Sequence, residues 1–197
     1  VFDQGWYEEN QVDLRTDSRV VKIDTVDKTL KMASGDSIEY DKLIIATGAR
    51  SNIPPFKGTD NQGVYSMRSL DDALKLKAAM KTAKKAVVIG GGVLGLEAVW
   101  EMISKGIAVA VVEFNQRLMP RQLDEAASLR LQELMVDKGI QLCLGVATDE
   151  ILGDGQVTGV KLNDGTVLEA DLVLLSTGVR PNLELAQEAG IEVGQGI

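Results

Sequence analysis

Three glycines and a later glutamate have the residue types and spacing that suit nucleotide binding. Gly90, Gly92 and Gly95 follow one apolar run, and Glu113 ends another. In a G-x-G-x-x-G turn the first glycine permits a tight turn, the second lets a pyrophosphate approach the backbone, and the third lets helix and strand pack closely. A carboxylate after the second strand can accept hydrogen bonds from ribose hydroxyls. These four residues predict a dinucleotide site.

The elements that must hold these residues can be read around them. Continuous apolar runs over 86–89 and 107–112 suit strands covered on both faces of a parallel sheet. Residues 93–105 between them predict a helix that the following glycine ends. The first turn of this helix, at Val93 and Leu94, presents free N–H groups and a partial positive charge to phosphates. Strand, glycine turn, helix, strand and acid stand in the order of a nucleotide-binding βαβ unit.

The acid also bears on the choice of nucleotide. A 2′-phosphate would bring further negative charge against Glu113, so the sequence predicts NAD in preference to NADP. Arg117 and Arg121 follow closely and are the residues that could weaken this preference.

A second signal is an internal repeat. DKLIIATGAR (41–50) and DLVLLSTGVR (171–180) share a strand-like run that ends in Thr-Gly-x-Arg. The residues before each run also match, with Gly35 aligned to Gly165, and each copy reads as β-rich runs joined by turns. Each copy therefore predicts an antiparallel β-meander followed by a buried strand. Such self-similarity indicates two copies of one domain, although a βαβ unit precedes only the second.

Several stretches of the chain resemble those of a known family. The stretches DKLIIATGAR, IPPFKG, VVIGGGVLGLEA and STGVRPN resemble those of pyridine-nucleotide flavoprotein reductases, which have one FAD-binding and one NAD(P)H-binding domain. The stretch VVEFNQRLMPRQLDE (111–125) resembles the FAD/NAD part of nitrite reductase large subunits more than glutathione or lipoamide reductases. The resemblance covers nearly the whole chain, which it identifies as an internal segment. It implies that activity requires parts of the FAD domain outside these residues.

The expected fold class follows from both signals. It is α/β, with two Rossmann-like dinucleotide-binding domains that each carry an antiparallel β-meander, the first domain being incomplete. We expect a partial FAD-binding domain over 1–68, an NAD-binding domain over 69–190, and a return towards the FAD domain over 191–197. Residues 51–63, rich in Pro, Gly and Asn, predict the crossing loop between the domains.

The resemblance implies two sets of cofactor residues. For NAD these are Gly90, Gly92, Val93, Leu94, Gly95, Glu97, Glu113 and Gly178; for FAD they are Val20, Ala46, Thr47, Gly48 and Arg50. Gly178 is implied at the nicotinamide end through its backbone, and Glu97 near the nicotinamide carboxamide. The alternative for Glu97 is a carboxylate that stabilises the helix dipole, and the alternative for Arg50 is a solvated loop arginine. No residue is firmly assigned a catalytic role, and no metal site is predicted.

The implied function is an FAD-dependent NADH oxidoreductase of the nitrite reductase type, in which NADH passes a hydride to flavin N5 and the cofactors perform the chemistry. The electron acceptor stays open between nitrite through a downstream domain, a small redox protein such as ferredoxin or rubredoxin, and dioxygen. A disulfide reductase and a non-catalytic NAD-binding module are further alternatives. A short-chain dehydrogenase would need Tyr-x-x-x-Lys, which none of the three tyrosines begins.

Composition limits the classes of partner and the cellular locations that fit this chain. A net charge of −8 argues against nucleic-acid binding. The longest apolar stretch, 86–100, contains four glycines and a glutamate and is too short to cross a bilayer. Cys143, the single cysteine, suits a reducing compartment and predicts an inert buried thiol. No signal peptide is visible, so a cytoplasmic protein without membrane attachment is predicted, with a homodimer as one candidate assembly.

Two further helices are expected. Ser69 and Asp72 resemble a capping box that begins a helix over 70–82. Residues 121–139 have apolar side chains on one face and end at a glycine, which predicts an amphipathic helix covering the sheet.

Overall fold

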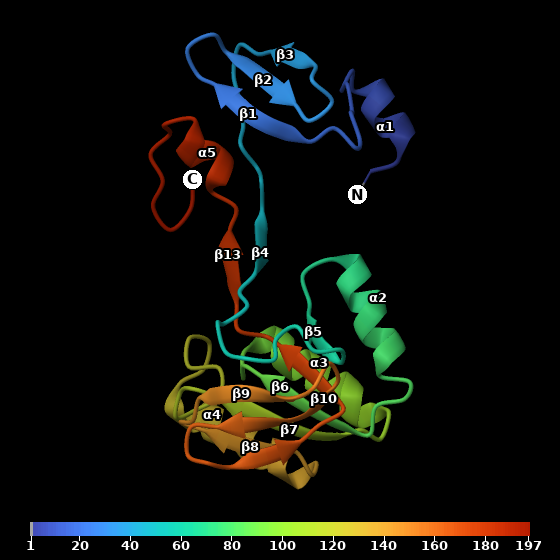
Figure 1. The fold of residues 1–197 in the computed structure, drawn as a ribbon, viewed down its shortest axis with the longest axis vertical. Coiled ribbons are helices and arrows are strands. Elements are labelled where there is room, and N and C mark those ends of the chain that lie inside the picture. The colour runs from blue at the N-terminus through green and yellow to red at the C-terminus, as the bar shows by residue number, and fades with distance from the viewer. Residues whose placement is uncertain (1) are drawn as a thin grey trace. The chain divides into compact units, whose positions relative to one another are not determined.

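A computed structural model describes residues 2–197, and these divide into two compact units (Figure 1). Among the described residues, unit 1 comprises 2–49 and 181–197, and unit 2 comprises 50–180. The units divide at other positions than the expected 68/69 and 190/191. Strand β5 (Val64–Ser66) explains the first difference, because it pairs with β12 (Leu172–Leu175) and so joins the segment before residue 69 to unit 2.

A five-stranded parallel sheet forms the centre of unit 2, in the order β5-β12-β6-β7-β8. The remaining strands are β6 (Lys85–Ile89), β7 (Ala108–Glu113) and β8 (Gln141–Leu144). Helix α3 (Val93–Ser104) connects β6 to β7, which pair in parallel. The expected strand–helix–strand unit is therefore present, with bounds within one residue of those predicted.

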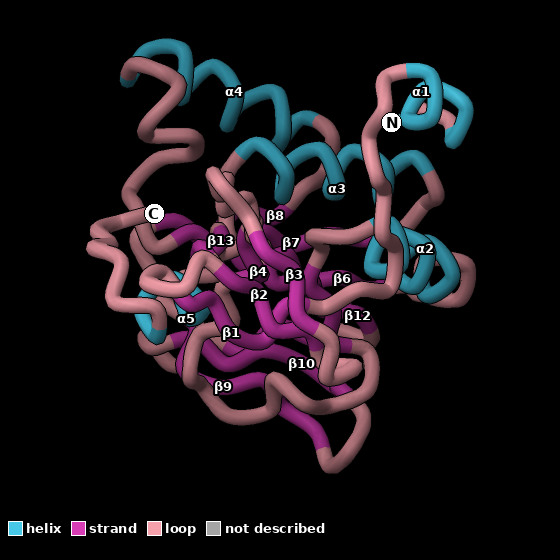
Figure 2. The backbone as a smooth tube through the Cα atoms, turned by 90° about the horizontal axis from the view of Figure 1, so that it is seen from above, coloured by secondary structure: helices cyan, strands magenta, loops and turns pink. Residues whose placement is uncertain are grey.

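Two layers cover this sheet on opposite faces (Figure 2). Helices α2 (Leu70–Ala79), α3 and α4 (Glu125–Asp137) lie on one face, and the meander of β9 (Thr148–Gly153), β10 (Val157–Leu162) and β11 (Val167–Glu169) lies on the other. Successive strand residues point to opposite faces, so Val88 and Val111 join the helical core while Val87 and Val112 join the meander core. Burial on both faces explains why residues 86–89 and 108–112 are apolar at every position.

Both expected covering helices are present, but α2 ends at Ala79 rather than residue 82, and α4 is shorter at both ends than the expected 121–139. Helix α2 begins at the predicted capping box, in which Ser69 accepts from the Asp72 N–H and the Asp72 carboxylate accepts from the Ser69 N–H. Helix α4 begins at Glu125 rather than residue 121, because Asp124 accepts from the Ala127 N–H as its N-cap. The preceding residues form turns instead.

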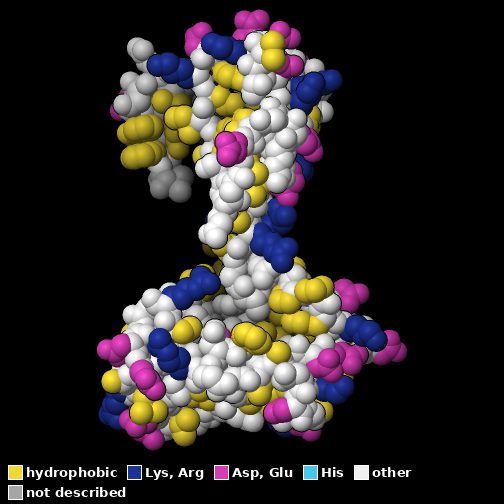
Figure 3. Space-filling model, turned by 90° about the vertical axis from the view of Figure 1, so that its left-hand side faces the viewer, with side chains coloured by type: hydrophobic (Ala, Val, Ile, Leu, Met, Phe, Trp, Pro, Cys, Tyr) yellow, Lys and Arg dark blue, Asp and Glu magenta, His cyan; other side chains and the backbone are white. Residues whose placement is uncertain are grey.

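Unit 1 contains a three-stranded antiparallel meander and two short helices. The strands are β1 (Val20–Asp24), β2 (Thr29–Met32) and β3 (Ser37–Glu39), and the helices are α1 (Gln4–Glu9) and α5 (Glu184–Glu188). Where the chain passes between the units, β4 (Ala49–Ser51) and β13 (Val179–Pro181) form a two-stranded sheet. On the face of unit 2 visible in Figure 3, acidic side chains lie among basic ones, so the negative charge is dispersed there.

The predicted repeat is present in the register of the two meanders. Leu30 pairs with Ile38 in the first meander, and Val160 pairs with Leu168 in the second. The turns agree as well: Met32 N donates to Asp36 O and Leu162 N to Thr166 O, both at 2.8 Å, and the glycines at 35 and 165 have φ of +98° and +90°. The same backbone turn, built twice, explains the matching glycines.

One expectation about the repeat is wrong. The run over 42–46 was expected to form a buried strand like β12, but it is assigned to no strand, and Ile44 is 90% exposed. β12 is buried because β5 and β6 pair with it on either side. Among residues 2–197 no strand pairs with 42–46, and strand-forming residues need such a partner to satisfy their backbone groups.

Candidate functional site

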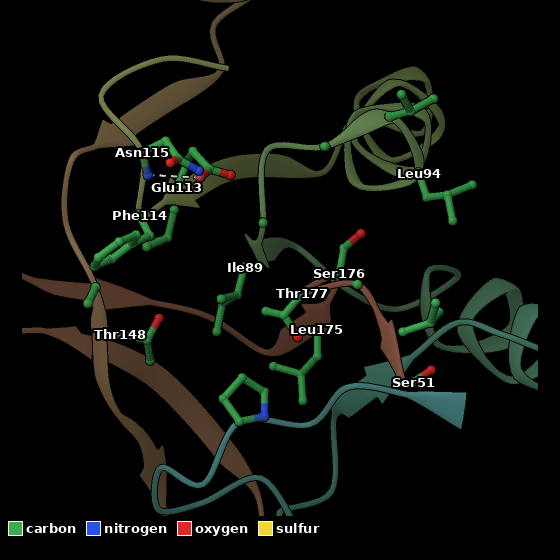
Figure 4. Close-up of a pocket in the computed structure, with 18 of the residues that line it drawn as sticks. Ser51, Ile89, Leu94, Glu113, Phe114, Asn115, Thr148, Leu175, Ser176 and Thr177 are labelled. Carbon is green, nitrogen blue, oxygen red and sulfur yellow. Dashed lines mark hydrogen bonds between the residues drawn. The ribbon is translucent and has the colours of Figure 1, made fainter. Parts of the chain in front are cut away.

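A pocket of about 670 Å³ lies in unit 2 at the carboxyl ends of β6, β7 and β12 (Figure 4). Its lining includes Ile89, Gly90, Gly92, Glu113, Ser176 and Gly178. Ligands of open α/β sheets bind at this edge, where neighbouring strands lead to opposite sides. The sheet order places β7 on one side of β6 and β12 on the other. The pocket therefore extends from the end of β7, across the glycine turn, to the end of β12.

The three glycines of the turn have different surroundings. Gly90 has φ of +113°, and a Cβ there would lie 2.2 Å from the Ser176 carbonyl oxygen. A Cβ on Gly95 would lie 2.3 Å from the Gly90 carbonyl oxygen, so only glycine lets α3 approach the turn this closely. A Cβ on Gly92 would meet no atom within 4 Å. The fold thus requires glycine at two positions, and the third leaves room for a ligand.

Gly92 is also the N-cap of α3, and no side chain bonds to this helix end. The first N–H groups of an α-helix have no intrahelical acceptor, so those at Val93 and Leu94 are available to an anion. Both residues line the pocket. This arrangement can hold a pyrophosphate through backbone groups alone.

Glu113 is 8% exposed, and its carboxylate is held by three donors. Oε2 accepts from the Gly91 N–H at 2.7 Å, while Oε1 accepts from the Asn115 N–H at 2.8 Å and from Asn115 Nδ2 at 2.5 Å. Figure 4 shows the Glu113–Asn115 bond at one end of the pocket. The acid is therefore oriented before any ligand arrives, and one of its roughly four lone-pair sites is left to accept from a ribose hydroxyl.

Sequence reasoning missed the two residues that hold this carboxylate. Gly91 is buried between the turn and the end of β7, and a Cβ there would lie 2.5 Å from Leu118 Cδ2. Asn115 stands two residues after the acid, a position where an amide can reach back to it. The middle one of three consecutive glycines and this asparagine were the available signals.

The two arginines named for selectivity differ in position. The Arg117 guanidinium donates to the carbonyl oxygens of Pro120 and Leu123, at 3.1 and 2.5 Å, and so supports the turn before α4. Arg121 lines the pocket. Of the two, only Arg121 belongs to the pocket wall.

An aromatic side chain lies beside the acid. Phe114 lines the pocket and is 77% exposed, with Val146 and Thr148 also in the wall (Figure 4). Sequence reasoning did not single it out. An exposed ring at a pocket edge offers a flat apolar surface to a planar base.

The remaining predicted residues are distributed over both units. Gly178 lines the pocket with φ of +87°. Glu97 is exposed on α3 and is not among the lining residues, so its place near the nicotinamide stays a prediction. Of the FAD set, Val20 begins β1, residues 46–48 are exposed in unit 1, and Arg50 is the first residue of unit 2.

Cys143 is half-buried in β8. Burial is the main cause that raises the pKa of its thiol, and the charge of Asp164 adds to this. The thiolate is the reactive form, so a raised pKa favours an inert thiol.

The fold and pocket define an α/β protein that presents a dinucleotide-binding turn. The family described as "Pyridine nucleotide-disulphide oxidoreductase" matches residues 6–197. The chain therefore belongs to this family of FAD- and NAD(P)H-dependent oxidoreductases, which confirms the resemblance and the fold class predicted from the motifs.

Several characterised relatives are similar over nearly the whole chain. The "Nitrite reductase [NAD(P)H]" of Bacillus subtilis (strain 168) is 44% identical over 99% of this chain and 24% of its own length. The "Nitrite reductase (NADH) large subunit" of Escherichia coli (strain K12) is 33% identical over 96% of this chain and 23% of its own length. The chain thus spans about a quarter of these relatives.

Among solved structures, the ferredoxin reductase for the CYP199A2 system from Rhodopseudomonas palustris superposes with a TM-score of 0.95 at 36% identity, over all of this chain and 48% of that one. Within residues 2–197, no helix is both long and apolar enough to cross a membrane.

Proposed function

We propose that unit 2 binds NADH, and that the chain is the NADH-binding segment, with part of the FAD domain, of a nitrite reductase-like oxidoreductase. One observation carries the nucleotide assignment. A single pocket joins an open glycine turn at a helix N-terminus to a carboxylate that is already oriented by Gly91 and Asn115.

Each part of NADH has a matching group in the pocket. The pyrophosphate lies over Gly92 and accepts from the first N–H groups of α3. The adenosine ribose donates to Glu113 at the end of β7, and the base packs on Phe114. The nicotinamide half then lies at the end of β12, near Gly178, because β12 is on the opposite side of β6 from β7.

The proposed preference for NADH rests on the Glu113 carboxylate. Three donors fix it at the ribose position, where a 2′-phosphate would meet its charge at short range. Arg117 bonds to backbone carbonyls, and so Arg121 is the basic residue of the pair that could offset this repulsion.

The FAD assignment concerns the first copy of the repeat. Ala46, Thr47 and Gly48 are exposed in unit 1, and Gly48 has φ of +67°, as its counterpart Gly178 has +87°. We assign these residues, with Val20 and Arg50, to contacts with FAD. With both cofactors bound, the nicotinamide supplies a hydride that the flavin accepts, and the protein supplies position and electrostatics.

The proposed electron acceptor is nitrite, supported by similarity to the two nitrite reductases. A small redox protein is the second candidate, favoured by the likeness to the ferredoxin reductase. Dioxygen is the third, since an NADH oxidase of Methanocaldococcus jannaschii is 33% identical over 98% of this chain. A homodimer in the cytoplasm is the proposed setting.

Calorimetric titration of the 197-residue chain tests the nucleotide assignment. We expect saturable, one-to-one binding of NADH, and at least about tenfold weaker binding of NADPH because the two nucleotides differ in charge at the ribose. Absence of NADH binding by the folded chain would overturn the proposal. The acceptor is tested separately, by following NADH oxidation by the full-length protein with nitrite, ferredoxin or dioxygen.

A further inference from the structure

The end of each repeated run, together with the two residues after it, forms a motif that the nucleotide site does not explain. TGARSN (47–52) and TGVRPN (177–182) share Thr, Gly, Arg and a final asparagine. Asn52 is joined to the second motif by three hydrogen bonds. Its N–H donates to Gly178 O at 2.9 Å, its Nδ2 donates to Thr177 O at 3.2 Å, and Thr177 Oγ1 donates to Asn52 O at 2.5 Å.

The other asparagine makes the same three bonds to the first motif. The Asn182 N–H donates to Gly48 O at 3.0 Å, its Nδ2 donates to Thr47 O at 2.9 Å, and Thr47 Oγ1 donates to Asn182 O at 2.7 Å. Each asparagine thus fixes the Thr-Gly turn of the opposite copy. In each case both partners lie in one unit: 52 with 177–178 in unit 2, and 182 with 47–48 in unit 1.

In unit 2 this arrangement fixes part of the pocket wall. Thr177 and Gly178 both line the pocket just beyond β12 (Figure 4). Asn52 does not line it, so the side chain acts behind the wall. The Asn52 Oδ1 is buried and has no hydrogen-bond partner among residues 2–197, so the amide group acts through its Nδ2 donor.

We propose that Asn52 is a positioning residue for the nicotinamide half of NADH. Sheet order places the end of β12 across β6 from Glu113, so a dinucleotide anchored by its ribose at Glu113 reaches the 177–178 turn with its other half. Asn52 holds the 177–178 turn in the conformation that receives the nicotinamide half. This inference rests on the proposed function of unit 2, which it deepens.

The test compares Asn52→Ala with Asn182→Ala in the 197-residue chain, with NADH and ADP titrated by calorimetry. ADP contains the adenosine and the pyrophosphate but lacks the nicotinamide half. We expect Asn52→Ala to weaken NADH about fivefold, since one neutral hydrogen bond is lost, while ADP changes less than about twofold. Asn182→Ala removes the same bond from the other unit, so both affinities should stay within about twofold.

A second variant guards against loss of folding. Thr177→Val is close to isosteric and removes the Oγ1 donor to Asn52 O, so it should weaken NADH binding more than ADP binding, as Asn52→Ala does. Equal NADH affinities for Asn52→Ala and Asn182→Ala, or equal losses of NADH and ADP, would overturn the positioning role. If the unaltered chain binds neither NADH nor ADP, the proposed function itself fails, and the two failures are therefore distinguishable.

Discussion

Gly92 and Gly95 show that one residue type can serve a ligand or the fold. Gly92 has an extended backbone (φ −86°, ψ 177°) that any residue can adopt, and no atom lies where its Cβ would be. Gly95 has the Gly90 carbonyl oxygen 2.3 Å from its Cβ position. A side chain should therefore have opposite consequences at the two positions.

We expect Gly92→Val to abolish binding of both NADH and NADPH while the thermal midpoint of unfolding stays unchanged, because the valine fills only the space for the pyrophosphate. Gly95→Val, the matched variant, should lower that midpoint because α3 must move away from the turn. Differential scanning calorimetry and nucleotide titration on the same samples separate the two effects. A stable Gly95→Val that binds as the parent chain does would contradict this account.

Glu113 serves both the fold and the ligand, since it accepts from Gly91 and Asn115 and faces the pocket. Bonds to a charged acceptor contribute roughly 1.5–3 kcal/mol, so Glu113→Ala should weaken NADH about ten- to a hundredfold. NADPH binding should stay equal or improve, because the repulsive charge is gone. Titration with both nucleotides checks this. A change in NADH affinity within about twofold would exclude Glu113 as the ribose ligand.

Asn115 offers a more sensitive test of the same carboxylate. Asn115→Ala leaves the charge in place but removes the Nδ2 donor to Oε1. In Asn115→Ala we expect the ratio of NADH affinity to NADPH affinity to fall by less than in Glu113→Ala. The double variant should have the same ratio as Glu113→Ala alone. Additive effects would show that Asn115 acts independently of Glu113.

At the scale of elements, local sequence signals predicted an element correctly where residues of that element satisfy its own backbone hydrogen bonds. Helix α2 begins at the predicted capping box because Ser69 and Asp72 satisfy each other's N–H groups within one turn. The 42–46 run has an equally strand-like composition and forms no strand, because a strand's hydrogen bonds must come from another segment.

Loss of the α2 cap gives an element-scale prediction. Ser69→Ala should lower the free energy of unfolding of unit 2 by about 1 kcal/mol, the usual cost of removing a serine N-cap. Denaturant titration monitored by circular dichroism measures this loss. Thr82→Ala is the control and should cost less, because Thr82 lies beyond the end of α2 and its hydroxyl donates to the Ala79 carbonyl oxygen rather than capping the start of the helix.

The same cap predicts a dependence on pH. The backbone bond from Ser69, followed by its hydroxyl bond, lowers the pKa of Asp72. A lowered folded-state pKa contributes stability that is complete above the unfolded value, about 3.9, and is lost as pH falls through the folded value. The difference in stability between the parent chain and Asp72→Ala should therefore shrink below about pH 4. A difference that persists unchanged at pH 2 would contradict this.

At the scale of the whole molecule, the division into units depends on segments that look like linkers. In the expected crossing loop, Phe56 is partly buried and packs against the core of unit 2. The loop backbone also bonds to the meander: Ile151 N donates to Lys57 O and Val157 N to Gln62 O, each at 2.9 Å. With β5 added to the sheet, residues 50–68 are structural parts of unit 2.

We expect the fragment 50–180 to unfold cooperatively and to bind NADH with the affinity of the whole chain. The fragment 69–190, drawn along the boundaries read from sequence, lacks β5 and the bonds of the loop, so it should unfold at lower denaturant concentration. Chemical denaturation of both fragments, with NADH titration of each, makes the comparison. Equal midpoints would mean that segment 50–68 contributes nothing to unit 2.

The sequence by itself determined the βαβ unit, the glycine turn with its acid, and the two meanders. These features depend on local periodicity and on single residues with a specific backbone role, such as Gly35 and Gly165 in equivalent turns. The sequence also determined the family, because its motifs are short and contiguous.

Only the tertiary structure decided which residues support the site. Asn115 and Gly91 meet at Glu113 from two strand ends, and Asn52 meets Thr177 across 125 positions of the chain. It also decided that β12 is a strand and 42–46 is not, and that 50–68 belongs to unit 2. Hydrogen bonds between distant segments carry no periodic signal along the chain, so their partners become visible only when the sheet order brings the segments together.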